Sequence, residues 1–255
     1  MKEDRQKFSI FTHVAHSYAA IICLFLLPGC NYIARKHTIE NWHQLRAAGD
    51  VAYYKHDYAA AQKCFDDALK IAQSMPDQPV RLAVVLEDLS KVCLAANDVG
   101  QASIIFDQAL ALANKRSQAP KKQIERIEES LGPCLNNLGQ VFAKAKKYEQ
   151  AAIAFREARA LFLDLYKLAS PILVNFIIGS YLAWTIDGLG TSYKEMGQLK
   201  EARQAYFSVK DYNIIKGLSL ELRQKLVNDF SKIPDTPKDE QNQYYSLLGC
   251  QPDNL

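Results

Sequence analysis

The sequence has few of the residues that interrupt regular structure. Only 11 Gly and 9 Pro occur in 255 residues, whereas 49% of the chain is hydrophobic and 23% is charged. This composition is typical of a globular protein with a real core, and it disfavours collagen-like, low-complexity and turn-dense all-β folds. A charge excess is also missing, because 31 Lys and Arg face 28 Asp and Glu. A net charge of +3 predicts no nucleic-acid partner, since a duplex binder would carry a basic stripe.

Motifs of common catalytic and cofactor sites are absent as well. The sequence contains no glycine-rich dinucleotide or P-loop motif, no His-Glu-x-x-His and no Gly-x-Ser-x-Gly. The histidines show no metal-ligand spacing, since His37, His43 and His56 are six and thirteen residues apart. We therefore predict a protein that is not an enzyme and needs no metal or cofactor. An enzyme whose site forms only in three dimensions is a weaker alternative.

Charged residues are missing from residues 8–34, and this gap indicates a targeting segment. A slightly basic start at residues 1–7 precedes it, and an unbroken apolar run of ten residues covers residues 18–27. A membrane-spanning helix needs about 20 apolar residues, whereas the core of a signal peptide needs about 7–15. Pro28 breaks the helix after the run, and Gly29 offers a small residue to a peptidase. The sequence thus predicts a signal peptide over residues 1–29.

The end of this segment, Leu26-Leu27-Pro28-Gly29-Cys30, resembles the lipobox of bacterial lipoproteins. The resemblance implies cleavage before Cys30, a diacylglyceryl group on its thiol, a lipid-anchored linker over residues 30–37 and a periplasm-facing protein. Two or more acyl chains anchor stably, because each buried CH₂ contributes about 0.8 kcal/mol. In such lipoproteins an aspartate directly after the lipidated cysteine favours retention in the inner membrane. This sequence has Asn31 there, so the resemblance favours the outer membrane. An uncleaved signal anchor and a buried N-terminal helix with a coincidental cysteine are the alternatives.

The rest of the chain repeats one pattern four times. The pattern starts at residues 45, 86, 135 and 186, and further apolar or small residues follow at +3, +4, +7, +13, +16, +20 and +23. Apolar residues at i, i+3 and i+7 form one face of a first helix. A small residue at i+4 allows a second helix to approach closely, and these residues are Gly49, Ser90, Gly139 and Gly190. Each unit is therefore predicted to be a helical hairpin with a polar turn.

This pattern resembles the tetratricopeptide repeat over about residues 41–216. The resemblance implies an all-α fold, a right-handed α-solenoid of about four hairpins. We place the solenoid and a capping helix (residues 218–231) within residues 38–231, followed by a flexible C-terminal tail over residues 232–255. Docking of residues 244–248 back onto the solenoid is an alternative for part of the tail.

The period differs from the family's. Equivalent alanines are 41, 49 and 51 residues apart, at positions 61, 102, 151 and 202, whereas the family repeats every 34 residues or so. The extra residues of each repeat are expected to lengthen its helices, as helical inserts at residues 77–85, 120–129 and 170–178. Long helices of this kind are similar to the repeats of kinesin light chains. Pro133, after Gly132, is expected to interrupt or kink the first helix of the third unit, because proline removes a backbone donor.

Four cysteines remain after loss of Cys23 and lipidation of Cys30, namely Cys64, Cys93, Cys134 and Cys250. Four cysteines in an oxidising compartment allow three pairings, and a Cys64–Cys93 pair is geometrically possible because the two lie on adjacent predicted helices. We favour free thiols, with Cys93 as a small buried apolar residue.

In the family that the chain resembles, first helices line a concave groove that holds an extended peptide or a partner helix. Asn side chains there can bond a peptide backbone, and Arg or Lys can bind its carboxylates. A solvated helix face is the alternative for any single residue. The carboxylate-clamp pattern of chaperone adaptors does not match, because Asp50 and Asp88 stand where that pattern needs neutral or basic groups. The predicted groove residues are Arg46, Asp50, Tyr53, Glu87, Lys91, Asn136, Asn137, Gln140, Lys144, Asp187, Thr191 and Lys194, with Trp184 beside them.

Together these features predict a lipoprotein that acts as a protein–protein interaction scaffold in envelope assembly, tethered to the membrane by a lipid and binding a protein or peptide partner in its groove. The alternative is a signal-anchored or cytosolic scaffold of the same repeats without lipidation.

Overall fold

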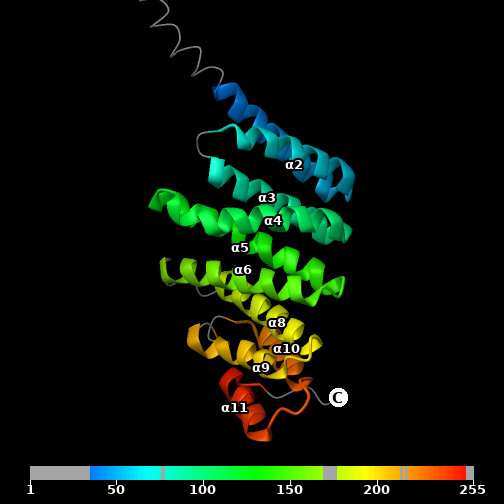
Figure 1. Ribbon diagram of the computed structural model, residues 1–255, viewed down its shortest axis with the longest axis vertical. Coiled ribbons are helices and arrows are strands. Elements are labelled where there is room, and N and C mark those ends of the chain that lie inside the picture. Colours follow the sequence, from blue (N-terminus) through cyan, green and yellow to red (C-terminus); the bar gives the residue numbers. More distant parts are fainter. Residues whose placement is uncertain (1–34, 76–77, 169–176, 213–214, 216–217, 251–255) are drawn as a thin grey trace, which may run out of the picture.

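The fold is an all-α solenoid, as the sequence predicts. The computed structural model describes residues 35–75, 78–168, 177–212, 215 and 218–250. Helices stack in pairs along the long axis of the molecule (Figure 1), and no strand occurs in the described ranges. One continuous apolar core runs through the stack from Trp42 to Leu248.

Within the described residues, the stack consists of four hairpins and two further helices. A first helix at residues 35–54 pairs with α2 (Tyr58–Gln73). The other elements follow in chain order: α3 (Gln78–Ala96) with α4 (Val99–Lys115), the short turn η1 (Arg116–Gln118), α5 (Lys121–Lys144) with α6 (Tyr148–Leu168), α8 (Gly179–Glu195) with α9 (Leu199–Phe207), the short turn η3 (Ser208–Tyr212), α10 (Leu220–Ser231) and α11 (Lys238–Leu248).

The turn of each hairpin has one backbone geometry. A residue with positive φ ends the first helix in every case, at His56 (61°), Asn97 (53°), Lys146 (59°) and Gly197 (74°). The next residue donates its N–H to a carbonyl five residues back, as from Asp57 to Ala52 and from Asp98 to Cys93, both at 3.0 Å. Left-handed residues commonly end helices in this way. The four turns are therefore copies of one turn.

Small residues let the two helices of a hairpin touch, as predicted. A Cβ added to Gly139 would lie 2.8 Å from the ring of Phe155, and one added to Gly190 would lie 2.3 Å from the ring of Tyr206. No real Cβ sits that close to a ring carbon, so only glycine fits there without a shift. In the second hairpin Ser90 is fully buried at the equivalent position.

The inserts lengthen first helices. Because α3 begins at Gln78 and α5 at Lys121, the first two inserts are helical as predicted. Most of the third insert, residues 170–176, lies outside the described residues. The sequence predicts an interruption or a kink at Pro133, and the interruption is wrong, because α5 continues through this buried residue. Packing of α5 against both α3 and α6 holds the helix together where proline removes one hydrogen bond.

The C-terminal tail is folded over part of its length. The prediction of a flexible tail over residues 232–255 does not hold for residues 238–248, which form α11. Tyr244 and Leu248 are fully buried on one face of this helix, and the Tyr244 ring centre is 4.2 Å from that of Phe230 on α10. Aromatic burial of this kind contributes enough free energy to hold a short helix in place.

The N-terminal predictions fall mostly outside this description. The predicted signal peptide and residues 30–34 of the predicted linker are not among the described residues, and residues 35–37 are already helical. In the part of the chain that is described, none of the helices is both long and apolar enough to traverse a bilayer.

Candidate partner-binding groove

A hollow of about 400 Å³ opens between α5, α8 and α10. Five of the predicted groove residues line it, and we call it the groove hollow. Its lining is Gln140, Ala143, Lys144, Phe155, Trp184, Asp187, Gly188, Thr191, Lys194, Lys225, Asp229 and Lys232.

Helical spacing brings these side chains together. Gln140 and Lys144 are one turn apart on α5, and Trp184, Asp187, Thr191 and Lys194 follow at steps of three and four along α8. Residues at such steps share one helix face. Two first helices, α5 and α8, therefore bring five of the predicted groove residues to one hollow.

The capping helix α10 closes the hollow, and the groove prediction missed this wall. Lys225, Asp229 and Lys232 follow at steps of four and three, so they share one face of α10. The buried stripe of the same helix consists of Leu222, Leu226, Val227 and Phe230. A charged stripe beside the apolar stripe of residues 218–231 was the available signal, but the groove was predicted from the first helices of the repeats alone.

A buried carboxylate forms the floor of the hollow. Asp187 pairs with Lys225, which also binds Asp229 at 2.7 Å, and the Tyr206 hydroxyl donates to Asp187 Oδ1 at 3.1 Å. Burial raises the pKa of Asp187 to about 6, although the Lys225 charge works in the opposite direction. The pKa of Lys225 is raised, because attraction to the two aspartates outweighs the burial of its ammonium. Lys225 is therefore a fixed positive charge that joins α8 to α10.

The rim of the hollow offers an aromatic ring and a free cation. Trp184 is 46% exposed, and the Lys225 ammonium lies 5.5 Å from its ring centre. Lys194 pairs with its neighbour Glu195 at 3.1 Å. Lys144 is exposed, and among the described residues no carboxylate lies within 4.0 Å of it. An indole and an unpaired ammonium that line one hollow can bind an apolar group and an acidic group of the same ligand.

The predicted residues of the first two repeats neutralise one another instead. Arg46 Nε lies 2.6 Å from Asp88 Oδ2, and Lys91 Nζ lies 2.9 Å from Glu87 and 3.5 Å from Asp88. The exposed Asp50 is nearby, and partial burial followed by the charge of Asp88 raises its pKa. This network ties the first helix to α3 and leaves little unpaired charge for a partner.

Asn136 is not a groove residue, and its prediction is wrong. Its side chain is buried between α5 and α8, and its Oδ1 accepts a hydrogen bond from Thr185 at 3.2 Å. The neighbouring Asn137 is partly exposed and donates from Nδ2 to Ser90 Oγ on α3 at 3.1 Å. Adjacent residues on a helix point about 100° apart, so the two amides join α5 to the repeats on either side.

Tyr53 lies apart from the groove hollow. Its ring packs 5.8 Å from Tyr54 and 5.9 Å from Tyr58, measured between ring centres, at the turn of the first hairpin. The His56 ring accompanies them, 3.0 Å from the Tyr58 hydroxyl through Nδ1. These residues form an aromatic cluster at one end of the first hairpin.

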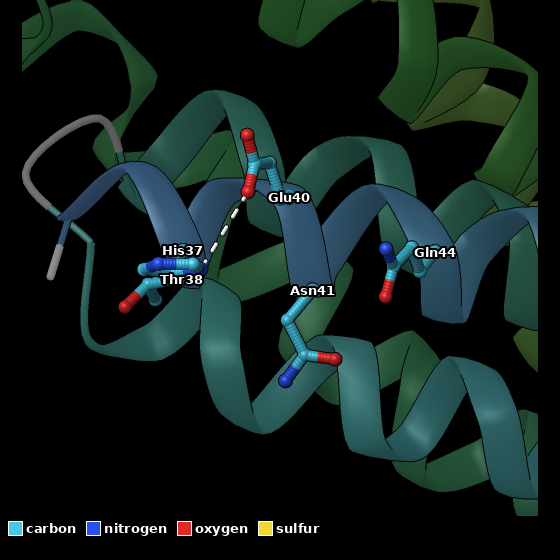
Figure 2. A pocket seen from close by; sticks show the side chains of 5 residues that line it. All are labelled: His37, Thr38, Glu40, Asn41 and Gln44. Carbon is cyan, nitrogen blue, oxygen red and sulfur yellow. Dashed lines mark ion pairs between the residues drawn. The ribbon is translucent and has the colours of Figure 1, made fainter. Parts of the chain in front are cut away.

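A polar hollow of about 370 Å³ lies on the first helix (Figure 2). All of its lining side chains come from that one helix, and His37 Nδ1 lies 3.6 Å from Glu40 Oε2. The lining is His37, Thr38, Glu40, Asn41 and Gln44.

Throughout the described ranges, no three His, Cys, Asp or Glu side chains gather in a way that could hold a metal ion.

The cysteines of the described chain are free thiols. Cys93 and Cys134 are buried, and Cys134 Sγ donates to the Leu86 carbonyl at 3.4 Å. Burial raises the pKa of Cys93 to about 12 and raises that of Cys134 as well. Thiols held protonated in this way are poor nucleophiles, so these two residues serve packing.

Comparison with known proteins agrees with the repeat geometry. Residues 42–115, the first two hairpins, match the tetratricopeptide repeat family. No curated protein matches the chain. The crystal structure of BtubC (BKLC) from P. vanneervenii is similar over 88% of this chain and 89% of that one, with a TM-score of 0.53 and 18% identity, which shows the fold alone. Residues 42–115 are therefore similar to tetratricopeptide repeats, which typically serve protein–protein interaction, and the same turn recurs in all four hairpins.

Proposed function

We propose that the protein is a scaffold that binds a protein partner in the groove hollow and is held at a bacterial membrane by a lipid on Cys30. The groove hollow carries the first part of this proposal. It gathers an exposed indole and an unpaired lysine on first helices of the repeats, and the capping helix closes it.

The chemistry of the hollow favours one kind of segment. Four lysines and two aspartates line it, and each aspartate already has a lysine partner. The Lys144 ammonium is left for an incoming carboxylate, and the Trp184 ring for an adjacent apolar side chain. We therefore expect an extended segment in which an acidic residue neighbours an aromatic or aliphatic one.

A display library of random short peptides tests this expectation. Peptides selected on the purified protein should be rich in Asp or Glu next to an apolar residue. Fluorescence anisotropy should then show that Lys144→Gln and Trp184→Ala each weaken binding by roughly tenfold. Lys115→Gln, which removes another exposed lysine at the end of α4, should bind as the wild type does. Equal affinities for the wild type and the three variants would show that the peptides bind outside the groove hollow.

The membrane part of the proposal is supported by the lipobox-like residues 26–30. Helix begins by Arg35, five residues after Cys30. At no more than about 3.6 Å per residue, such a tether is shorter than about 18 Å. A lipid on Cys30 would therefore hold the first hairpin close to the membrane surface.

Labelling with radioactive palmitate in a bacterial host tests the anchor. The wild type should incorporate label and should have the mass of a chain cleaved before Cys30, whereas Cys30→Ala should do neither. Equal labelling of the two proteins with an unchanged mass would support the signal-anchored or cytosolic scaffold instead. Cell fractionation then decides between these two locations.

A further inference from the structure

A second hollow, of about 460 Å³, lies between α9, η3 and α11 near the C-terminal end of the solenoid. We propose that this C-terminal hollow binds a phosphate group, either of a soluble phosphate compound or of a phospholipid headgroup. Its lining is Lys200, Arg203, Gln204, Phe207, Lys210, Glu240 and Gln243.

Helical spacing again explains why these side chains meet. Lys200, Arg203, Gln204 and Phe207 follow at steps of three, one and three, so they form one face of α9. Lys210 extends the same side into η3, and α11 contributes Glu240 and Gln243 opposite them. Figure 1 shows α11 beyond α9 at the end of the stack, where a longer solenoid would place its next hairpin. The end of the solenoid is thus a lined hollow.

The charge of the lining is unbalanced. Arg203 Nε lies 3.2 Å from Glu240 Oε2, the single carboxylate of the lining. Lys200 and Lys210 are exposed, and within the described residues no carboxylate lies within 4.0 Å of either ammonium. The Lys210 ammonium lies 6.0 Å from the centre of the Phe207 ring. Two unneutralised ammonium groups therefore flank a guanidinium whose remaining N–H groups can still donate.

A phosphate group fits these donors better than a carboxylate does. It carries up to two negative charges and three strong acceptor oxygens, and one guanidinium with two ammonium groups supplies three separate cationic donors. The amides of Gln204 and Gln243 can donate to the same oxygens. The half-buried Phe207 ring gives the apolar part of an ester a surface to pack on.

The C-terminal hollow shares no residue with the groove hollow. The phosphate proposal is therefore independent of the partner proposed for the groove, and each can fail without the other.

Titration calorimetry with inorganic phosphate and with glycerol 3-phosphate, at constant ionic strength, tests the proposal on the full chain. The wild type should show saturable binding, and the double variant Lys200→Gln/Lys210→Gln should bind at least about tenfold more weakly. Lys121→Gln/Lys122→Gln, which removes two exposed lysines from the first turn of α5, should bind as the wild type does. Glu240→Gln should bind more tightly, because it frees Arg203.

Co-sedimentation with vesicles identifies the source of the phosphate. The Cys30→Ala protein, which cannot carry a lipid, is mixed with phosphatidylcholine vesicles with or without phosphatidylglycerol. Pelleting that needs phosphatidylglycerol and both hollow lysines assigns the site to a headgroup, whereas binding of the soluble phosphates alone assigns it to a soluble ligand. The proposal is overturned if neither probe binds, or if the hollow variant and the α5 variant lose binding equally.

Discussion

The carboxylate of Asp187 on α8 forms an ion pair with the ammonium of Lys225 on α10, and this contact joins the last repeat to the capping helix. Burial destabilises the charged carboxylate more than the Lys225 charge stabilises it, so the pKa of Asp187 is raised. The same pair forms the floor of the groove hollow, so the residues that hold the capping helix also shape the proposed binding site.

The first prediction concerns pH. The folded-state pKa of Asp187, about 6, lies above its usual value of 3.8. The folded state therefore favours the protonated carboxyl, and the stability that this preference contributes is fully present below about pH 4 and is lost as the pH rises through 6. We expect the free energy of unfolding of the wild type, relative to Asp187→Asn, to fall by about 2–3 kcal/mol between pH 4 and 7. Urea denaturation at a series of pH values measures this, and parallel curves for the two proteins would contradict it.

The second prediction concerns the repeated turn. Lys146 has a φ of 59°, and this left-handed conformation costs an L residue roughly 1–2 kcal/mol. Glycine avoids this strain but loses more backbone entropy on folding, so Lys146→Gly should raise the free energy of unfolding by about 0.5–1 kcal/mol. Gly197→Ala should lower the free energy of unfolding by about 1 kcal/mol, because the φ of Gly197 is 74° and alanine is strained there. An added Cβ would meet nothing within 4 Å, so backbone strain is the whole effect.

Ala145 supplies the matched control for the turn. It precedes Lys146 with an ordinary φ of −80°, so Ala145→Gly should lower stability. If glycine has the same effect at positions 145 and 146, the left-handed turn does not explain either result. Thermal and urea denaturation followed by circular dichroism give the comparison.

The third prediction concerns an ion pair between the second and third hairpins. Arg116 Nε donates to the buried Glu128 at 2.9 Å, and its Nη2 donates to Asp164 at 3.2 Å. Arg116→Ala would leave Glu128 charged and buried without a partner, at a cost of about 3–5 kcal/mol. The double variant Arg116→Ala/Glu128→Gln should recover much of this loss, because a neutral amide is cheaper to bury.

Denaturant unfolding of both single variants and the double variant completes this cycle. Burial already raises the pKa of Glu128 against the effect of Arg116, so Arg116→Ala should also become more stable as the pH falls, when the carboxyl can take up a proton. A double variant as unstable as Arg116→Ala would show that packing of the arginine, and not charge, holds the junction.

The repeated hairpins could be predicted from the sequence because their packing depends on residue size at fixed spacing. Gly49, Ser90, Gly139 and Gly190 recur at one position of the pattern; the three glycines lie against an aromatic ring of the second helix of their hairpin, and Ser90 is fully buried. Periodicity records such contacts directly. Helix α11 was anticipated only as an alternative, the docking of residues 244–248, because its burial depends on rings contributed by other helices, such as Phe230, which local composition does not reveal.

The sequence pattern indicates which helices are the first helices of the repeats, and Gln140, Lys144 and Thr191 on two of these helices line the groove hollow. It does not distinguish a polar side chain that faces a partner from one that bonds a neighbouring repeat. Asn136 shows this limit, because its hydrogen bond to Thr185 crosses 49 residues of sequence.

The four left-handed turns lie along one edge of the solenoid, and the connection from α4 through η1 to α5 lies at the opposite edge, where one hairpin is joined to the next (Figure 1). One margin of the molecule is therefore uniform, whereas the chain between hairpins varies in length at the other, and part of the added length packs into the core through Val80, Ala83 and Ile127. A fluorescent protein or an epitope spliced in after Ala119 would sit on the variable margin, and all four hairpins would remain as they are.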